Sequence, residues 1–185
     1  MAAVSDHEDQ SETAPETTTP AADLRERQRP LKAAYREDPS SAVVTGTATA
    51  TVDQQALTAT VGTWAGDVVA GLHPSPGGDG TQACSADILM QALVACAGVT
   101  LASVATALGV QVRSASVTAH CTWDARGTLG VDRDAPVGLT DVELVVDLDT
   151  DAEEEKVARL LELTERYCVV ARTLADPPEV RIRRA

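Results

Sequence analysis

The first half of the chain passes from the alternating pattern of β-strands to one long apolar run. Residues 41–52 and 55–65 are rich in Thr and Val, and the polar pair Asp53-Gln54 separates them, which predicts a β-hairpin. Residues 66–73 predict a third strand, and the Gly- and Pro-rich residues 74–82 predict a loop. Strands therefore precede the apolar run.

The apolar run covers residues 88–112 and contains no charged residue. It is long enough to span a bilayer, but Ala dominates over Leu, Ile and Phe, which favours a helix buried in a globular protein. Polar side chains also point in several directions around such a helix: Gln91, Thr100, Ser103 and Thr106. We expect Ser85 to be the N-cap, Asp87 to lie in the first turn, and Gly109 to end the helix.

The second half predicts two strands, a helix and a final strand. Two segments alternate with period two, and their apolar residues are Ala115, Val117, Ala119, Cys121 and Trp123 in one and Val142, Leu144, Val146 and Leu148 in the other. Residues 151–170 predict an amphipathic helix whose apolar stripe is Val157, Leu160, Leu161, Thr164 and Cys168. Residues 179–184 predict a last strand. The order of elements indicates the α+β class.

The N-terminal residues differ in composition from the rest. Residues 1–22 contain five acids and neither Lys nor Arg, so we interpret them as a disordered acidic tail. Residues 23–39 form an N-terminal arm, in which Pro30 argues against one unbroken helix. Residues 40–185 form the folded domain.

Composition and charge exclude several classes of function. The 185 residues include 28 acids and 15 bases, and the net charge of -13 argues against binding to nucleic acid or to an anionic membrane surface. Phe is absent, so the core must be built from Ala, Val and Leu. The first twenty residues lack the basic and apolar regions of a secretory signal, so we expect a cytoplasmic protein with reduced cysteines.

Two of the four cysteines stand out by position. Cys96 lies within the uncharged helix and Cys168 near the end of the second predicted helix. Each could be a small apolar core residue or a reactive thiol, and the residues alone leave both interpretations open. The spacing of Cys84 from Cys96 and the pair His120-Cys121 match no zinc motif, so we expect no metal site.

Two segments carry a resemblance to a known family. CSADILMQALVACAGVTLASVATALG and LTERYCVVARTL, with RGTLGV between them, resemble the OsmC/Ohr family of organic hydroperoxide reductases from about Tyr35 to the C-terminus. The resemblance implies an OsmC-like fold in which antiparallel sheets wrap around long central helices in an intertwined homodimer. It also implies that Cys96 is the peroxidatic thiol and Cys168 the resolving thiol.

The chain departs from the family at one motif. Typical peroxidases of the family have Pro-Glu eleven and ten residues before the first cysteine, and that Glu bonds an Arg that lowers the thiol pKa. Here Ser85 and Ala86 occupy those places, and the nearest acid is Asp87. Arg36 and Arg172 are the candidate cations. Burial of Cys96 and its distance from the start of its own helix predict a raised pKa unless a cation lies nearby.

We therefore expect thiol-dependent reduction of organic hydroperoxides through two cysteines, as a defence against oxidative stress. The expected partners are a second copy of the chain, a hydroperoxide substrate and a thiol reductant, with no metal or organic cofactor, no nucleic acid and no membrane. The alternative is a non-enzymatic OsmC-like protein that binds a small apolar ligand at the dimer interface. A third possibility is a redox sensor whose acidic tail recruits a partner.

Overall fold

The computed structural model describes residues 20–184, and the chain divides into two units, Met1–Ala42 and Val43–Ala185. In the first unit, helix α1 (Pro20–Glu37) is followed by the 3-10 turn η1 (Pro39–Ala42). The expectation that Pro30 interrupts this helix is wrong: Pro30 lies inside α1. It is exposed, so the carbonyl that lacks its N–H partner can bind water.

The predicted acidic tail lies mostly outside the described residues. Residues 20–22, its last three, belong to α1. The division into residues 1–22, 23–39 and 40–185 stays a prediction, and the contact-based boundary between Ala42 and Val43 lies three residues after the one expected.

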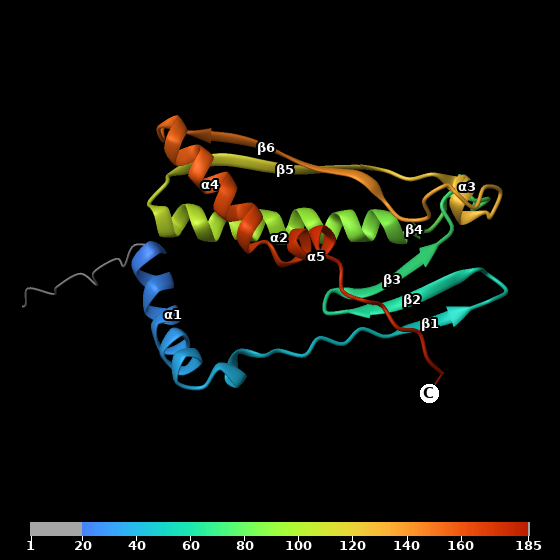
Figure 1. Cartoon of the computed structure of the whole chain (residues 1–185), viewed down its shortest axis with the longest axis horizontal. Helices are drawn as coiled ribbons and strands as arrows, with labels where there is room; N and C mark the ends of the chain where they lie inside the picture. Colours follow the sequence, from blue (N-terminus) through green and yellow to red (C-terminus); the bar gives the residue numbers. More distant parts are fainter. Residues whose placement is uncertain (1–19, 185) are drawn as a thin grey trace, which may run out of the picture. The chain divides into compact units, whose positions relative to one another are not determined.

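The second unit begins with a four-stranded sheet in the order β1-β2-β3-β4 (Figure 1). Its strands are β1 (Ala50–Asp53), β2 (Thr58–Thr63), β3 (Gly66–Gly71) and β4 (Ala83–Cys84). The predicted hairpin is confirmed, with Val52 opposite Ala59. The first strand is shorter than predicted, because residues 43–49 have no strand neighbour among the described residues.

The apolar run forms α2 (Ser85–Leu108), a single helix of 24 residues. Gly109 ends it in the left-handed conformation (φ 65°), and Asp87 lies in its first turn, both as predicted. The prediction for the N-cap is wrong: Cys84, still paired in β4, holds that position, and no side chain caps the helix. Ser85 is the first residue of α2.

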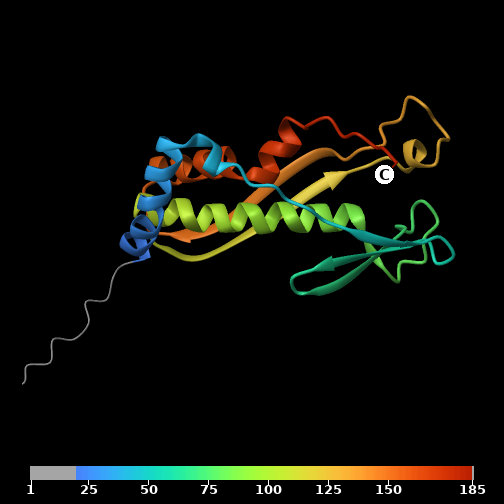
Figure 2. The ribbon, with the colours of Figure 1, turned by 90° about the horizontal axis from the view of Figure 1, so that it is seen from below.

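A two-stranded antiparallel sheet follows, made of β5 (Val112–Thr122) and β6 (Thr140–Thr150), and it runs along α2 (Figures 1 and 2). Between the strands lies the short helix α3 (Ala125–Thr128). The predicted alternation holds in the middle of both strands, where Val117, Ala119, Leu144 and Val146 are half-buried. Near the ends it fails, since Ala115 and Val142 are exposed.

The second predicted helix is two helices. α4 (Glu154–Tyr167) ends before Cys168, whose backbone is extended (φ -73°, ψ 107°), and α5 (Val169–Ala175) begins immediately after it. The β-branched pair that starts α5 has a lower helix propensity than the Leu-rich α4. The predicted final strand is absent from the described residues, where 176–184 follow α5 without regular structure.

Two adjacent clusters form the core along α2. Leu101, Ala105 and Val110 pack against Leu160 of α4. Leu93 and Ala97 pack against Cys168. By length and composition α2 is the one described helix that could cross a membrane, and 33% of its most apolar window is buried. Core helices of globular proteins meet the same criterion, and α2 is packed as a core helix is, against β5, α4 and α5.

Candidate functional site

The fold brings together two cysteines that are 72 residues apart in the chain. Cys96 lies on α2, and Cys168 lies at the break between α4 and α5, in the same apolar cluster. Both thiols are free, and their side chains are hydrogen-bonded to each other. Cys168 is fully buried, whereas Cys96 is half-buried. These are the two residues that the sequence predicts as the reactive pair.

The surroundings of Cys96 favour its thiolate. Its pKa is lowered, chiefly because the backbone N–H of Val170 donates a hydrogen bond to the sulfur. Burial opposes this effect, and hydrogen bonds from the Cys168 side chain, the Val169 N–H and the Thr100 side chain reinforce it. The expectation of a raised pKa in the absence of a cation is therefore wrong. N–H groups at the start of α5, and not a cation, lower the pKa of Cys96. They are available to the sulfur because they have no acceptor within their own helix.

Cys168 behaves in the opposite way. Burial raises the pKa of its thiol, and so does its hydrogen bond to Cys96, while the Ala171 N–H lowers it. The pair therefore consists of a Cys168 thiol with a raised pKa that donates a hydrogen bond to the sulfur of Cys96, whose pKa is lowered. Of the two thiols, Cys96 loses its proton more readily.

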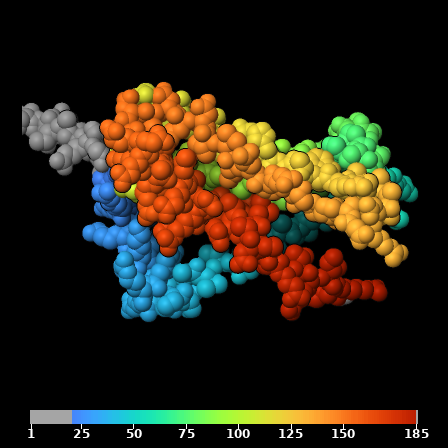
Figure 3. All heavy atoms as spheres, turned by 45° about the horizontal axis from the view of Figure 1, so that its top comes forward, coloured from blue at the N-terminus to red at the C-terminus, as the bar shows by residue number. Residues whose placement is uncertain are grey.

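An apolar groove of about 800 Å³ adjoins Cys168. Leucines and valines of α2, β6, α4 and α5, and the leucine just before β6, line it: Leu89, Leu93, Leu139, Val142, Leu144, Val146, Leu161 and Leu174. In Figure 3, α2 (green) is visible between β6 (orange) and α5 (red). Three carboxylates, Glu143, Glu162 and Glu165, and the guanidinium of Arg172 are its charged groups. Its volume lies in the usual range for sites that bind small molecules.

The other predicted site residues are not part of the thiol pair. Asp87 is exposed and lies nine residues before Cys96, a rise of about 13 Å along the helix. Arg36 belongs to the first unit, and both cysteines belong to the second. Arg172 is exposed on α5 and lines the groove, while its backbone N–H bonds the Cys168 carbonyl. Within the second unit, Arg172 is the predicted cation beside Cys168.

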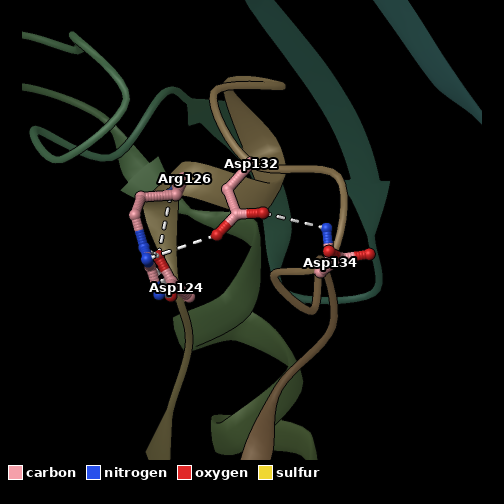
Figure 4. Close-up of polar contacts among 4 residues, drawn as sticks. All are labelled: Asp124, Arg126, Asp132 and Asp134. Carbon is pink, nitrogen blue, oxygen red and sulfur yellow. Dashed lines mark hydrogen bonds and ion pairs between the residues drawn. The ribbon is translucent and has the colours of Figure 1, made fainter.

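The RGTLGV segment contains a further cation, but its charge is already satisfied (Figure 4). The Arg126 guanidinium bonds the Asp124 carboxylate, at 3.1 Å from Nε to Oδ1, and reaches Asp132 Oδ2 at 3.3 Å. Asp124 also caps α3 through the Arg126 backbone N–H, and Asp132 accepts from the Asp134 N–H. The cluster holds this loop in shape and leaves Arg126 with two carboxylate partners.

The remaining cysteines, Cys84 and Cys121, are free and half-buried. Cys121 lies on the half-buried face of β5, as predicted. Among residues 20–184, no three His, Cys, Asp or Glu side chains are grouped as metal ligands would be. The chemistry available at the site is therefore that of two adjacent thiols beside an apolar groove.

The profile of the OsmC-like protein family matches residues 78–183, which include both cysteines and more than half of the chain. The chain belongs to the OsmC-like protein family. No curated protein matches its sequence.

Solved structures of OsmC-like proteins share the fold. The OsmC-like protein of Mycoplasma pneumoniae has a TM-score of 0.60 at 14% identity, over 72% of this chain and 89% of its own. An organic hydroperoxide resistance protein of Elizabethkingia anophelis has a TM-score of 0.58 at 18% identity, over 73% and 91%. An OsmC-like protein of unknown function from Vibrio cholerae has a TM-score of 0.57 at 14% identity, over 71% and 94%. At identities this low, the similarity of the structures establishes that the chain has the α+β OsmC-like fold.

The contribution of α5 to the site is not evident from the sequence. The amphipathic pattern predicts one helix over residues 151–170, with Cys168 near its end and not between two helices. The Val169-Val170 pair, with its low helix propensity, was the available signal for a break. That break is what turns N–H groups of the chain toward both sulfurs.

Proposed function

We propose that this OsmC-like protein reduces organic hydroperoxides, with Cys96 as the peroxidatic residue and Cys168 as the resolving residue. One observation carries the proposal: two free thiols share a hydrogen bond, and the same surroundings lower the pKa of one and raise the pKa of the other. A nucleophile and a proton donor are thus adjacent. Family membership and the hydroperoxide resistance protein among the fold relatives support this choice of reaction.

The first step is attack by the Cys96 thiolate on the hydroxyl oxygen of the hydroperoxide. The S–O bond forms as the O–O bond breaks, Cys96 becomes a sulfenic acid, and the departing alkoxide takes up a proton to leave as an alcohol. Cys168 then attacks the sulfenic sulfur, a disulfide forms, and the hydroxyl leaves as water. Two thiol groups of an external reductant restore both cysteines and become a disulfide themselves.

The hydrogen bond between the side chains favours resolution. A disulfide requires an S–S distance of about 2.05 Å and Cβ atoms about 4 Å apart. The hydrogen bond between the two side chains supports a disulfide between them, because it places both thiols in one contact. Because thiols must be reduced at the start of each cycle, we place the reaction in the cytoplasm, as part of the defence against oxidative stress.

We also propose that the working form is a homodimer. Val99 is 70% exposed in the middle of α2, where a helix so apolar needs cover. Val180 and Ile182, which alternate in the expected final strand, are more than four-fifths exposed. A second copy would provide apolar cover for the helix and a strand neighbour for residues 179–184.

The experiment that tests the peroxidase proposal is consumption of cumene hydroperoxide with a dithiol reductant in excess. We expect Cys96→Ser to abolish turnover, because a hydroxyl is not ionised at neutral pH. Without reductant, Cys168→Ser is expected to consume one equivalent and leave a sulfenic acid that dimedone traps. Cys121→Ser is the matched control and should behave as the wild type. Full activity of Cys96→Ser would refute the assignment.

The groove supports a second candidate, binding of a small apolar ligand without catalysis. Its leucine- and valine-rich lining and volume of about 800 Å³ suit such a ligand. In that case both cysteines are core residues, and hydroperoxide leaves their thiols intact. The same consumption assay, together with titration of free thiols, separates the two functions.

A further inference from the structure

Helix α1 carries an apolar stripe with no role in the reaction described above. Its members recur at alternating spacings of three and four residues, as in a heptad pattern: Ala21, Leu24, Gln28, Leu31 and Tyr35. Leu31 is 49% exposed and Tyr35 is 40% exposed. Most of the stability of a helix in a protein comes from packing of its apolar face, so this stripe calls for a cover.

The charges on α1 are sorted around the stripe. In the heptad pattern, the positions immediately beside the stripe hold three bases and no acid: Arg25, Arg27 and Lys32. The far side holds the three acids and the other two bases: Asp23, Glu26, Glu37, Arg29 and Arg36. Arg27 is paired with Asp23 at 3.0 Å. Within residues 20–184 this leaves Arg25 and Lys32 as the bases beside the stripe that a partner could engage.

The groove beside Cys168 has the complementary arrangement. Its walls are mostly leucine and valine, and three of its four charged groups are carboxylates, Arg172 being the exception. Glu162 is paired with Arg159 at 2.6 Å. Among the described residues, Glu143 and Glu165 form no ion pair. An apolar stripe with bases beside it therefore matches an apolar groove with unpaired acids at its edge.

The stripe and the groove also match in length. Leu24 and Tyr35 are eleven residues apart, a rise of about 16 Å along α1. The residues of α2 that line the groove run from Leu89 to Ala97, a rise of about 12 Å, and the lining continues along α5 as far as Ala175. The groove volume of about 800 Å³ suits a small molecule, which a few apolar side chains resemble in size.

We propose that α1 of one copy of the chain docks in the groove of a second copy. Leu24, Leu31 and Tyr35 pack against the leucines of the groove, and the flanking bases face its unpaired acids. In a dimer with twofold symmetry each copy supplies one helix and one groove, so one exchange covers both surfaces on both copies. The helix and a small apolar ligand are alternative occupants of the groove. The inference goes beyond the proposed function, because it involves no step of the thiol chemistry.

The test is carbodiimide cross-linking of the intact wild-type protein, which joins a lysine amine to a carboxylate in contact with it. The chain contains two lysines, Lys32 on α1 and Lys156 on α4. Chains labelled with ¹⁵N and unlabelled chains are mixed in urea, refolded together, cross-linked and digested for mass spectrometry. We expect peptides that join Lys32 to Glu143, Glu162 or Glu165 and that combine one labelled with one unlabelled chain. Without any refolding, a denaturing gel should show linked pairs of 19.3 kDa chains.

A second measurement uses tryptic cleavage after Arg27 in the full chain, since the rate of cleavage follows the fraction of helix that is undocked. We expect Leu31→Ser to raise this rate about tenfold, because it removes one buried leucine from the contact. Ala33→Ser is the matched control. It makes the same change to serine in the same turn of α1 but on the far side from the stripe, and should leave the rate at the wild-type value.

Several results would overturn the proposal. Links from Lys32 that are confined to single chains, with no linked pair on the gel, would show that α1 docks within its own chain. Absence of links from Lys32 to the groove carboxylates, or equal cleavage of Leu31→Ser and Ala33→Ser, would show that α1 does not dock in the groove. Neither assay contains hydroperoxide, so a protein that forms the expected links but consumes no hydroperoxide refutes the proposed function alone.

Discussion

Replacement of Val169 by Pro removes one hydrogen-bond donor from the site with little other disturbance. Val169 is the first residue of α5, its N–H donates to the Cys96 sulfur, and its side chain is 71% exposed. Pro is favoured at the first position of a helix. The preceding Cys168 already has the extended backbone (ψ 107°) that a following Pro requires.

The size of the effect follows from the hydrogen bond that is lost. A bond to a charged group contributes about 1.5 to 3 kcal/mol. Val169 ranks below Val170 among the donors to Cys96, so we take the lower end, about 1.5 kcal/mol, or about a tenfold smaller thiolate fraction at acidic pH. Removal of a donor from the charged form raises the pKa of Cys96. The rate of alkylation therefore shifts to higher pH and keeps its alkaline plateau.

The assay is alkylation of Cys96 followed through a pH series, with Val169→Ala as the matched control that keeps the N–H. We expect the control to follow the wild type, since the Val169 side chain is mostly in solvent. A Val169→Pro profile identical to that of Val169→Ala would refute the assignment of the Val169 N–H as a donor to the Cys96 sulfur.

Five further substitutions, which test three predictions, concern the fold and the assembly. Leu160→Ala should lower the free energy of unfolding in urea by about 2–5 kcal/mol because Leu160 is fully buried, and Leu161→Ala, at a site 38% exposed, should cost less than half as much. Ser85→Ala should leave the free energy of unfolding unchanged, because the Ser85 side chain caps no helix. Asp124→Ala should lower it by about 1 kcal/mol, because it removes the bond from the Arg126 N–H that caps α3. Equal losses in the two variants would contradict this assignment of the caps. Val99→Glu should convert a dimer of 19.3 kDa chains into a monomer by sedimentation, and a monomeric wild type would contradict the proposed assembly.

Hydrophobic periodicity predicted the elements that bury one face within the chain. The α2 run, the hairpin before it and the β5–β6 pair have strong local patterns, and each is present. Hydrophobic periodicity did not predict which segments form strands where strand formation depends on pairing with a neighbouring strand. Residues 43–49 and 179–184 read as strands but have no sheet neighbour among the described residues. An alternating sequence favours an extended backbone, but a strand forms only where the edge of a sheet is available to pair with it.

The sequence predicts the two cysteines that the fold brings together but not the backbone groups that surround them. Cys96 and Cys168 were chosen by position and resemblance, and the fold brings them into contact. The family resemblance implies a cation near Cys96, and neither Arg36 nor Arg172 is among the groups that lower its pKa. Backbone N–H groups are present in every residue and carry no sequence signal, so their convergence at the break after Cys168 could not be predicted before the structure.

The central claim is that Cys96 and Cys168 form one redox pair, and thiol mapping after oxidation tests it most directly. The wild-type protein is treated without oxygen with one equivalent of cumene hydroperoxide, then alkylated and digested for mass spectrometry. We predict a linked peptide that joins Cys96 to Cys168, with Cys84 and Cys121 still alkylated and one equivalent of alcohol released. If both site thiols remain alkylated and no linked peptide forms, the redox pair is refuted and the groove's ligand-binding function is favoured.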